Sequence, residues 1–482
     1  MMKLSKQIMY ERSIAKDQTY DGQFFTGVLT TGIYCLPSCP ARKPKFDNVR
    51  FFATEAEAIA TGLRACKRCR PDLFARGKRW DEALYEGLIE RVRAEPSAFK
   101  DMHSLAATAG IGITNLADLI RTHAHLTPAA LLRQEQVTFA CQRLIDSNER
   151  VIDLAHEAGF ESEATFHRQF LATTAMTPGA YRALRETKSF LLQLPADFRA
   201  LDVLRYHGRD SEGAFEQVCG QQISIPLRLN NLLVKLKFTL QTPGAWCEVE
   251  YDGAPAPQTM VKAHVIAMRM LGLYSDSASF EARANKQEYV RTLVANHRGL
   301  RIPLAPGAFE ALVWAIIGQQ INLAFAVQLR RALIKHAGDP VGAGGQYTHP
   351  SPERIAAMDP SELTVLRYSR SKAEYLIHAA QAICSGQLPL DRLAQGSAQV
   401  ADRTLRKVRG LGPWTTHYTL MRGLGLADCM PAGDSGLATG LQRLHQLPQR
   451  PSAEQMAALM APFAPHRSLA TCHVWASLAT QA

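Results

Sequence analysis

The spacing of hydrophobic positions changes along the chain and predicts segments of different structure. From about residue 82 to 187, apolar residues recur at helical spacing, so this segment is expected to be helical. Residues 190–198 and 246–253 then suggest strands and residues 227–240 suggest a helix, which together predict a small α+β unit running to about residue 290. The rest of the chain is expected to be mainly helical.

The helical segment contains an internal repeat. Residues 105–133 and 154–182 each follow the order helix, glycine-containing turn, helix, and Ala109-Gly110 in the first copy matches Ala158-Gly159 in the second. This pattern predicts a duplicated helix-turn-helix, with a structural helical linker as the alternative.

Length and composition fit a soluble protein built from several globular domains. The chain has 482 residues, of which 46% are hydrophobic and 21% charged, and its length predicts about three or four domains. No apolar run is long enough to span a membrane. The formal net charge is +11, and residues 1–80 contribute most of it, with 15 lysines and arginines against 7 acidic residues.

Four cysteines within that basic segment form two close pairs. Cys35 and Cys39 are separated by three residues, Cys66 and Cys69 by two, and the pairs lie about thirty residues apart. This spacing is typical of a tetrahedral zinc site with four thiolate ligands. The alternatives are four unrelated structural thiols, or disulfides, which the absence of a secretory signal disfavours.

Basic residues surround these cysteines. A positive field that clusters around a metal site favours a polyanion such as nucleic acid as partner, with a solvated basic surface as the less favoured alternative. The residues concerned are Arg42, Lys43, Lys45, Arg50, Arg64, Lys67, Arg68 and Arg70.

The segments TTGIYCLPSCPAR and CKRCRPD resemble the N-terminal domain of the Ada family of methylation-damage sensors. The resemblance implies that Cys35 is both a zinc ligand and the acceptor of a methyl group from a DNA methylphosphotriester, and that Cys39, Cys66 and Cys69 complete the site. Zinc would keep the sulfur deprotonated and therefore nucleophilic. Methylation would remove about one negative charge from the cluster, so DNA binding is expected to tighten.

The second helix-turn-helix copy carries GFxSxxxFxRxF followed by TPxxYR and closely resembles the AraC-type DNA-binding domain. Phe160, Phe166 and Phe170 are expected in its core. The resemblance implies that its recognition helix enters the major groove, with these residues near DNA: Glu161, Glu163, Ala164, His167 and Arg168. In the first copy, where this helix is expected at about 113–122, Asp118 replaces the arginine, which weakens the case for sequence reading by that half.

Residues 408–415 fit a helix–hairpin–helix. Gly410 and Gly412 would let backbone N–H groups approach a phosphate, with Arg409 and Thr415 beside them. Asp434 follows twenty residues after Trp414. With this spacing, the hairpin resembles the helix–hairpin–helix superfamily of base-excision glycosylases, and the AlkA family in particular.

Residues 308–326 and 466–477 support the AlkA resemblance, because they are similar to that family's DNA-probing loop and to its C-terminal helix with a base-contacting tryptophan, here Trp475. The resemblance implies that Asp434 stabilises the sugar cation that forms as the base leaves. Trp475, Trp414 and Tyr418 are candidates for stacking on the flipped base. Trp414 stands where lyase members carry lysine, so a monofunctional enzyme is expected.

The sequence departs from these families in three places. Arg409 replaces the usual hairpin proline, and Gln320 occupies the position of an apolar wedge that fills the gap left by the flipped base. The proline–cysteine–histidine–arginine site of the second Ada methyltransferase domain does not occur, so reversal of guanine O6 methylation is not expected.

The sequence thus predicts a multidomain, mainly α protein with α+β parts. The expected domains are a zinc and methyl-acceptor domain (1–80), a double helix-turn-helix (82–187), an AlkA-like α+β subdomain (190–290) and a helix–hairpin–helix glycosylase domain (291–482). The expected function combines a damage-sensing activator with removal of alkylated bases such as 3-methyladenine. Two alternatives remain: a regulator whose glycosylase half only clamps DNA, and a purely structural zinc finger.

The expected cofactor is one Zn²⁺ per chain, with structural and nucleophile-activating roles. The expected partners are damaged double-stranded DNA, promoter DNA and RNA polymerase, with no membrane. The protein is expected to be a monomer in the cytoplasm, at the bacterial nucleoid.

Overall fold

The computed structural model describes residues 4–77, 79–241, 243–284, 288–342 and 344–479. The chain divides into two compact units, Met1–Ile89 and Glu90–Ala482. Both combine helices with a sheet, which confirms the expected mainly helical, multidomain class. Among the described residues, no helix is both long and apolar enough to cross a bilayer.

The first unit is built on a small four-stranded sheet with the strand order β3-β1-β2-β4. Strand β1 pairs antiparallel with β2 and β3, while β4 runs parallel to β2. Phe25, Tyr34 and Phe52 form its core with Leu36 and Leu63. The elements are α1 (Lys6–Ile14), β1 (Phe25–Val28), β2 (Ile33–Cys35), β3 (Val49–Phe52), α2 (Glu55–Ala60), β4 (Arg64–Ala65) and α3 (Pro71–Ala75).

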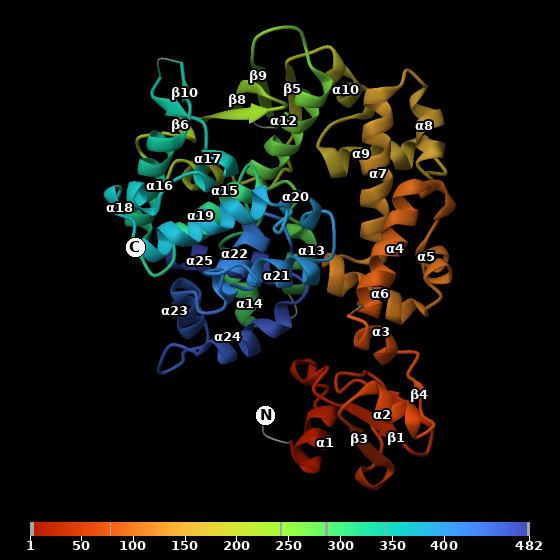
Figure 1. The fold of residues 1–482 in the computed structure, drawn as a ribbon. Helices are drawn as coiled ribbons and strands as arrows, with labels where there is room; N and C mark the ends of the chain where they lie inside the picture. Colours follow the sequence, from red (N-terminus) through yellow and green to blue (C-terminus); the bar gives the residue numbers. More distant parts are fainter. Residues whose placement is uncertain (1–3, 78, 242, 285–287, 343, 480–482) are drawn as a thin grey trace. The chain divides into compact units, whose positions relative to one another are not determined.

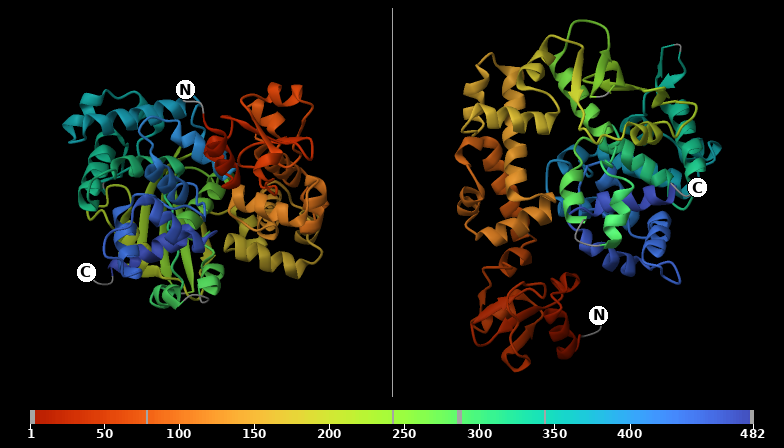
Figure 2. Two further views of the ribbon diagram at one scale, coloured as in Figure 1. Left: turned by 90° about the horizontal axis from the view of Figure 1, so that it is seen from below. Right: turned by 180° about the vertical axis from the view of Figure 1, so that it is seen from behind.

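A run of helices opens the second unit and follows the predicted repeat. In each copy, a turn containing a glycine of positive φ, Gly110 or Gly159, joins two helices. The helices are α4 (Trp80–Ala94), which begins in the first unit, α5 (Met102–Ala109), α6 (Ile113–Ala124), α7 (Pro128–Asp146), α8 (Val151–Glu157), α9 (Glu163–Thr174) and α10 (Pro178–Arg182). The helices of residues 102–182 lie beside the rest of this unit in all three views (Figure 1 and Figure 2).

A five-stranded antiparallel sheet follows, in the order β5-β9-β8-β7-β6. The predicted helix at 227–240 is wrong, because these residues form most of the hairpin of β7 and β8. Asn230 and Asn231 adopt positive φ values of 49° and 65°, the conformation of a tight hairpin turn, and side chains alternate in burial along β8. The elements are β5 (Ser189–Gln193), α11 (Ala200–His207), β6 (Gln217–Cys219), β7 (Gln222–Leu229), β8 (Leu232–Gln241), β9 (Gly244–Glu250) and α12 (Pro257–Met270).

The remainder is helical apart from one short hairpin, and it encloses its own hydrophobic core. The helices are α13 (Ser277–Ala284), α14 (Glu288–Ala295), α15 (Ala308–Ile317), α16 (Leu323–Ala337), α17 (Pro352–Ala356), α18 (Pro360–Val365), α19 (Arg370–Cys384), α20 (Leu390–Leu393), α21 (Ala398–Arg406), α22 (Pro413–Arg422), α23 (Ser435–Leu444), α24 (Ala453–Met460) and α25 (Arg467–Ala479). The hairpin pairs β10 (Pro340–Val341) with β11 (Gln346–Tyr347).

Candidate metal centre and active site

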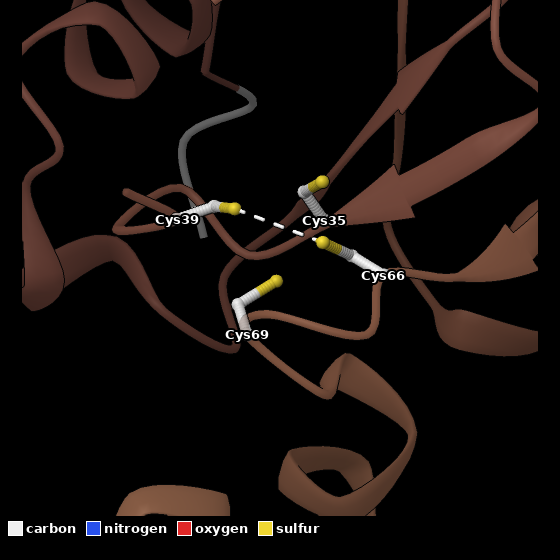
Figure 3. A group of neighbouring side chains, drawn as sticks. All are labelled: Cys35, Cys39, Cys66 and Cys69. Carbon is white, nitrogen blue, oxygen red and sulfur yellow. Dashed lines mark hydrogen bonds between the residues drawn. The ribbon is translucent and has the colours of Figure 1, made fainter. Parts of the chain in front are cut away.

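The four N-terminal cysteines meet at one end of the small sheet. Cys35 ends β2 and Cys66 directly follows the parallel neighbour β4, while Cys39 and Cys69 lie in the turns that come next. Their sulfur atoms all lie within 4.8 Å of one another, and Sγ of Cys39 is 3.9 Å from Sγ of Cys66 (Figure 3). The Leu36 N–H donates to Sγ of Cys69 at 3.4 Å.

This arrangement fits a tetrahedral zinc ion. Zinc–sulfur bonds of about 2.3 Å place tetrahedral sulfur ligands about 3.8 Å apart, close to the spacing observed. Hydrogen bonds among the sulfurs lower the pKa of Cys39 to about 7 and also lower the pKa of Cys66, while they raise the pKa of Cys35 and of Cys69. Two of the four thiols are therefore ready to lose their protons, and a bound metal would displace the protons of the other two.

The basic residues around the cysteines differ in their placement. Arg42, Lys45, Lys67 and Arg68 are exposed. Lys43 is half-buried, and its Nζ donates to the Pro37 carbonyl oxygen at 3.0 Å. Burial lowers the pKa of Lys43. Lys43 therefore differs from the exposed cations, because its ammonium group braces the loop between Cys35 and Cys39.

In the second helix-turn-helix copy, Phe160, Phe166 and Phe170 are buried, as predicted. The other face of α9 is exposed and carries four of the five residues expected near DNA, and the fifth, Glu161, is exposed in the turn before the helix. The four are Glu163, Ala164, His167 and Arg168. In the first copy, Asp118 is exposed on α6 and pairs with Arg121 at 3.0 Å. The Asp118 carboxylate is thus partly neutralised by its own helix.

The hairpin between α21 and α22 depends on one glycine. Gly410 has φ +90°, and a Cβ at this position would come within 2.2 Å of the Tyr375 ring. Gly412 has no such neighbour, so a Cβ there would meet open space. Arg409 is exposed. Thr415, expected beside the phosphate-facing backbone, has a buried side chain whose hydroxyl accepts a hydrogen bond from Gln319, so this side chain braces the hairpin.

The loop between α15 and α16 is tied to the same hairpin. Nε2 of Gln319 donates to the Gly410 carbonyl oxygen and to Oγ1 of Thr415, both at 2.9 Å. Gln320 follows with φ +54° and an exposed side chain. The anchored glutamine therefore fixes the backbone that presents Gln320 to solvent.

Asp434 is the N-cap of α23, and its carboxylate is held from three sides. Trp414 Nε1 donates to Oδ2 and Trp475 Nε1 donates to Oδ1, both at 2.9 Å. The Leu437 N–H also donates to Oδ1, at 2.7 Å. Trp414 stacks on Tyr418 with ring centroids 5.4 Å apart, and Tyr418 lies 6.4 Å from Trp475. The structure thus brings together all four residues predicted for this site.

Sequence reasoning missed further members of the cluster. Arg209 lies over the rings of Tyr206 and Trp314, and Arg422 lies over Tyr206 and 5.9 Å from the Trp475 ring centroid. Tyr206 lies in the last turn of α11, and Arg209 follows two residues after that helix ends, in the α+β part. Their neighbours are distant in sequence, so no local pattern marks them.

Comparison with known proteins matches three parts of the chain. Residues 8–72 match the metal binding domain of Ada, residues 105–184 a helix-turn-helix domain, and residues 313–465 the HhH-GPD superfamily of base excision DNA repair proteins. These matches confirm the predicted resemblances.

Relatives extend the comparison to the whole chain. A probable bifunctional transcriptional activator/DNA repair enzyme AlkA of Mycobacterium tuberculosis is 31% identical over 97% of this chain and 96% of its own length. A DNA-3-methyladenine glycosylase of Bacillus subtilis is 33% identical over 42% of this chain and 68% of its own. The fold of part of this chain resembles that of the 3-methyladenine DNA-glycosylase of Archaeoglobus fulgidus, with a TM-score of 0.53, 21% identity and coverage of 59% of this chain and 97% of that one.

These findings define a class of protein in which a metal binding domain like that of Ada and a helix-turn-helix domain are joined to a domain of the HhH-GPD superfamily of base excision DNA repair proteins. Within that class, the chain belongs to the family of bifunctional transcriptional activator/DNA repair enzyme AlkA proteins.

Proposed function

We propose that this protein removes alkylated bases such as 3-methyladenine from double-stranded DNA by hydrolysis of the N-glycosidic bond. The observation that carries the proposal is the Asp434 carboxylate, oriented by two indole N–H groups inside an aromatic cluster. The relatives named as glycosylases support it.

The chemistry follows from that arrangement. The flipped base stacks on Trp414, Tyr418 or Trp475, and the C1′–N bond breaks with its electron pair going to the base. The Asp434 carboxylate stabilises the positive charge that develops on the sugar. Water adds to C1′ and loses a proton. Trp414 cannot form a Schiff base, so the backbone is left uncut.

The test is release of 3-methyladenine from alkylated DNA by wild type and by Asp434→Asn. Wild type should release the base, whereas the variant should lose at least about a hundredfold in single-turnover rate because a neutral amide stabilises the sugar cation poorly. A wild-type protein that binds the DNA but releases no base would leave the clamp alternative as the better function.

We also propose that Cys35 accepts a methyl group from a DNA methylphosphotriester. Zinc held by the four cysteines would keep their sulfurs deprotonated. Sγ of Cys35 attacks the methyl carbon in line, the carbon–oxygen bond breaks, and the phosphodiester leaves with the electron pair. The cluster then holds a neutral thioether, and the loss of one negative charge favours binding to promoter DNA and activation through RNA polymerase.

Mapping the methylated residue after incubation with methylphosphotriester DNA tests this second activity. Modification at Cys35 is expected in wild type and absent in Cys35→Ser. Folded protein that stays unmodified would assign the cysteines a structural role only. The proposal includes one zinc per chain and a monomer acting at the bacterial nucleoid, which metal analysis, sedimentation and fluorescence localisation can check.

A further inference from the structure

The loop of residues 423–434 joins α22 to α23 and carries Asp434 at its end; we call it the Asp434 loop. Two side chains from the start of α25 hold its middle. Arg467 forms an ion pair with the Asp428 carboxylate at 2.7 Å, and Oγ of Ser468 accepts the N–H of the residue after Asp428 at 3.0 Å. The loop is therefore anchored to α25 at two successive residues.

The same part of the loop is held from another side by the helix-turn-helix segment. The Asp428 N–H donates to Nδ1 of His125 at 3.1 Å. His125 is half-buried and is the C-cap of α6. Burial lowers the pKa of His125 to about 4, so the ring is neutral at pH 7 and Nδ1 can accept this hydrogen bond. The first helix-turn-helix copy thus contacts the backbone of the Asp434 loop directly.

The second helix-turn-helix copy shows that the turn after α6 does not itself require a histidine. Ala175 occupies the matching position after α9 and adopts φ +56°, close to the +58° of His125. His123 likewise matches Thr173, and its Nδ1 is 2.7 Å from Oγ of Ser397, the N-cap of α21. The two histidines that distinguish the first copy at the end of its second helix therefore both contact the later part of the chain.

The stretch from Asp428 to Asp434 is short and tied at several points. Nδ1 of His417, on α22, contacts the Met430 carbonyl oxygen. The next four residues form a turn that ends at Asp434 and is closed by a backbone hydrogen bond of 3.1 Å. The position of this stretch, and with it the start of α23, depends on His417 from one side and on His125 from the other.

We propose that His125 is a positioning residue for base release: by accepting the Asp428 N–H it fixes the Asp434 loop and, through it, the Asp434 carboxylate. The inference rests on the proposed glycosylase function and deepens it, because it assigns part of the helix-turn-helix segment to the support of the repair site. Without an acceptor at residue 125, the Asp428 N–H turns to water and the loop shifts. A displacement of about 1 Å at a reacting group costs on the order of a hundredfold in rate. The first copy, in which Asp118 replaces arginine, thereby has a role that does not depend on reading DNA.

The experiment measures release of 3-methyladenine from alkylated DNA under single-turnover conditions, with the affinity for the same DNA recorded in parallel. His125→Ala removes the acceptor and keeps the backbone conformation, since alanine adopts φ +56° at the matching position of the second copy. Its rate should fall at least about tenfold and its affinity should change less than about threefold, because a misplaced carboxylate impairs the reaction and not the binding. His125→Asn supplies Oδ1 as an acceptor and tolerates positive φ, so its rate should stay within about threefold of wild type.

His103→Ala is the matched control, since His103 is exposed on α5 of the same copy. Its rate and its affinity should equal those of wild type. Circular dichroism checks that each variant is folded, and His125→Gly replaces His125→Ala if alanine prevents folding. A folded variant without the acceptor that keeps the wild-type rate would overturn the inference, as would equal losses in that variant and in His125→Asn, or a loss of rate that follows affinity. A wild-type protein that releases no base would overturn the proposed function instead.

Discussion

At the scale of single residues, the orientation of Asp434 depends on two indoles that are also stacking surfaces. Trp475→Phe would keep an aromatic ring but remove the N–H that donates to Oδ1 of Asp434. We expect the single-turnover rate of base release to fall about tenfold, because the carboxylate loses part of its fixed orientation. Trp414→Phe removes the equivalent donor at Oδ2 and should have a similar effect.

The measurement is base release from a defined lesion duplex, with DNA affinity recorded in parallel. Affinity should change little in either variant. A rate that falls only together with affinity would mean that the tryptophans act through binding, not through Asp434.

At the scale of elements, the hairpin between α21 and α22 offers a pair of matched glycines. Gly410→Ala places a methyl group within 2.2 Å of the Tyr375 ring in a backbone conformation that alanine disfavours, and we expect the free energy of unfolding to fall by about 2–4 kcal/mol. Gly412→Ala has nothing within 4 Å and φ −74°, so its stability should change by less than about 0.5 kcal/mol. Denaturant unfolding followed by circular dichroism compares the two.

A second prediction concerns the four-stranded sheet. The Cys66 N–H donates to the Tyr34 carbonyl oxygen where β2 and β4 pair beside the cysteines. Chelation of zinc should therefore accelerate hydrogen exchange at the Cys66 amide. Hydrogen exchange by mass spectrometry measures this. The pairing of β7 with β8 is the internal control and should stay protected.

Local signals predicted some elements well and others badly. The glycine turns, the cysteine spacing and the hairpin each lie within a short stretch of chain, so the sequence alone located them. Residues 227–240 were predicted as a helix because a leucine-rich run is compatible with a helix or a strand. The turn between β7 and β8 depends on the positive φ values of Asn230 and Asn231, which the hydrophobic pattern did not reveal. Tyr206 and Arg209 were missed because tertiary packing, not sequence proximity, brings them to Trp314. The division of the chain into four domains remains a prediction.

At the scale of the second unit, each helix-turn-helix copy forms hydrogen bonds with the later part of the chain, residues 190–479. In both copies these bonds lie at the end of the second helix. In the first copy, Nδ1 of the buried His123 is 2.7 Å from Oγ of Ser397, and the Asp428 N–H donates to Nδ1 of His125 at 3.1 Å. In the second copy, Nε2 of His264 donates to the Thr174 carbonyl oxygen at 2.8 Å. The starts of α6 and α9 remain exposed, so these contacts do not cover the ends that are predicted to face DNA.

These anchors predict that acid loosens the attachment of the helix-turn-helix segment. Burial lowers the pKa of His125 and of His264 to about 4, below the value of 6.5 for an ordinary histidine. The unfolded state therefore binds more protons between these values, so the stabilisation is complete above about pH 6.5 and is lost as pH falls toward 4. At pH 5 the loss is about 2 kcal/mol for each histidine.

Protonation of His125 has a direct structural consequence, because Nδ1 can then no longer accept the Asp428 N–H. The Asp428 carboxylate favours the protonated ring, whereas Arg467, His417 and His123 favour the neutral ring. His125→Asn provides the control, since asparagine tolerates the φ of +58° and offers an acceptor that does not titrate. Hydrogen exchange of α6 should accelerate between pH 7.5 and 5, after correction for intrinsic rates, in wild type and less in the variant, while β8 stays protected in both. Equal acceleration in wild type and variant would show that His125 does not set the acid sensitivity of this attachment.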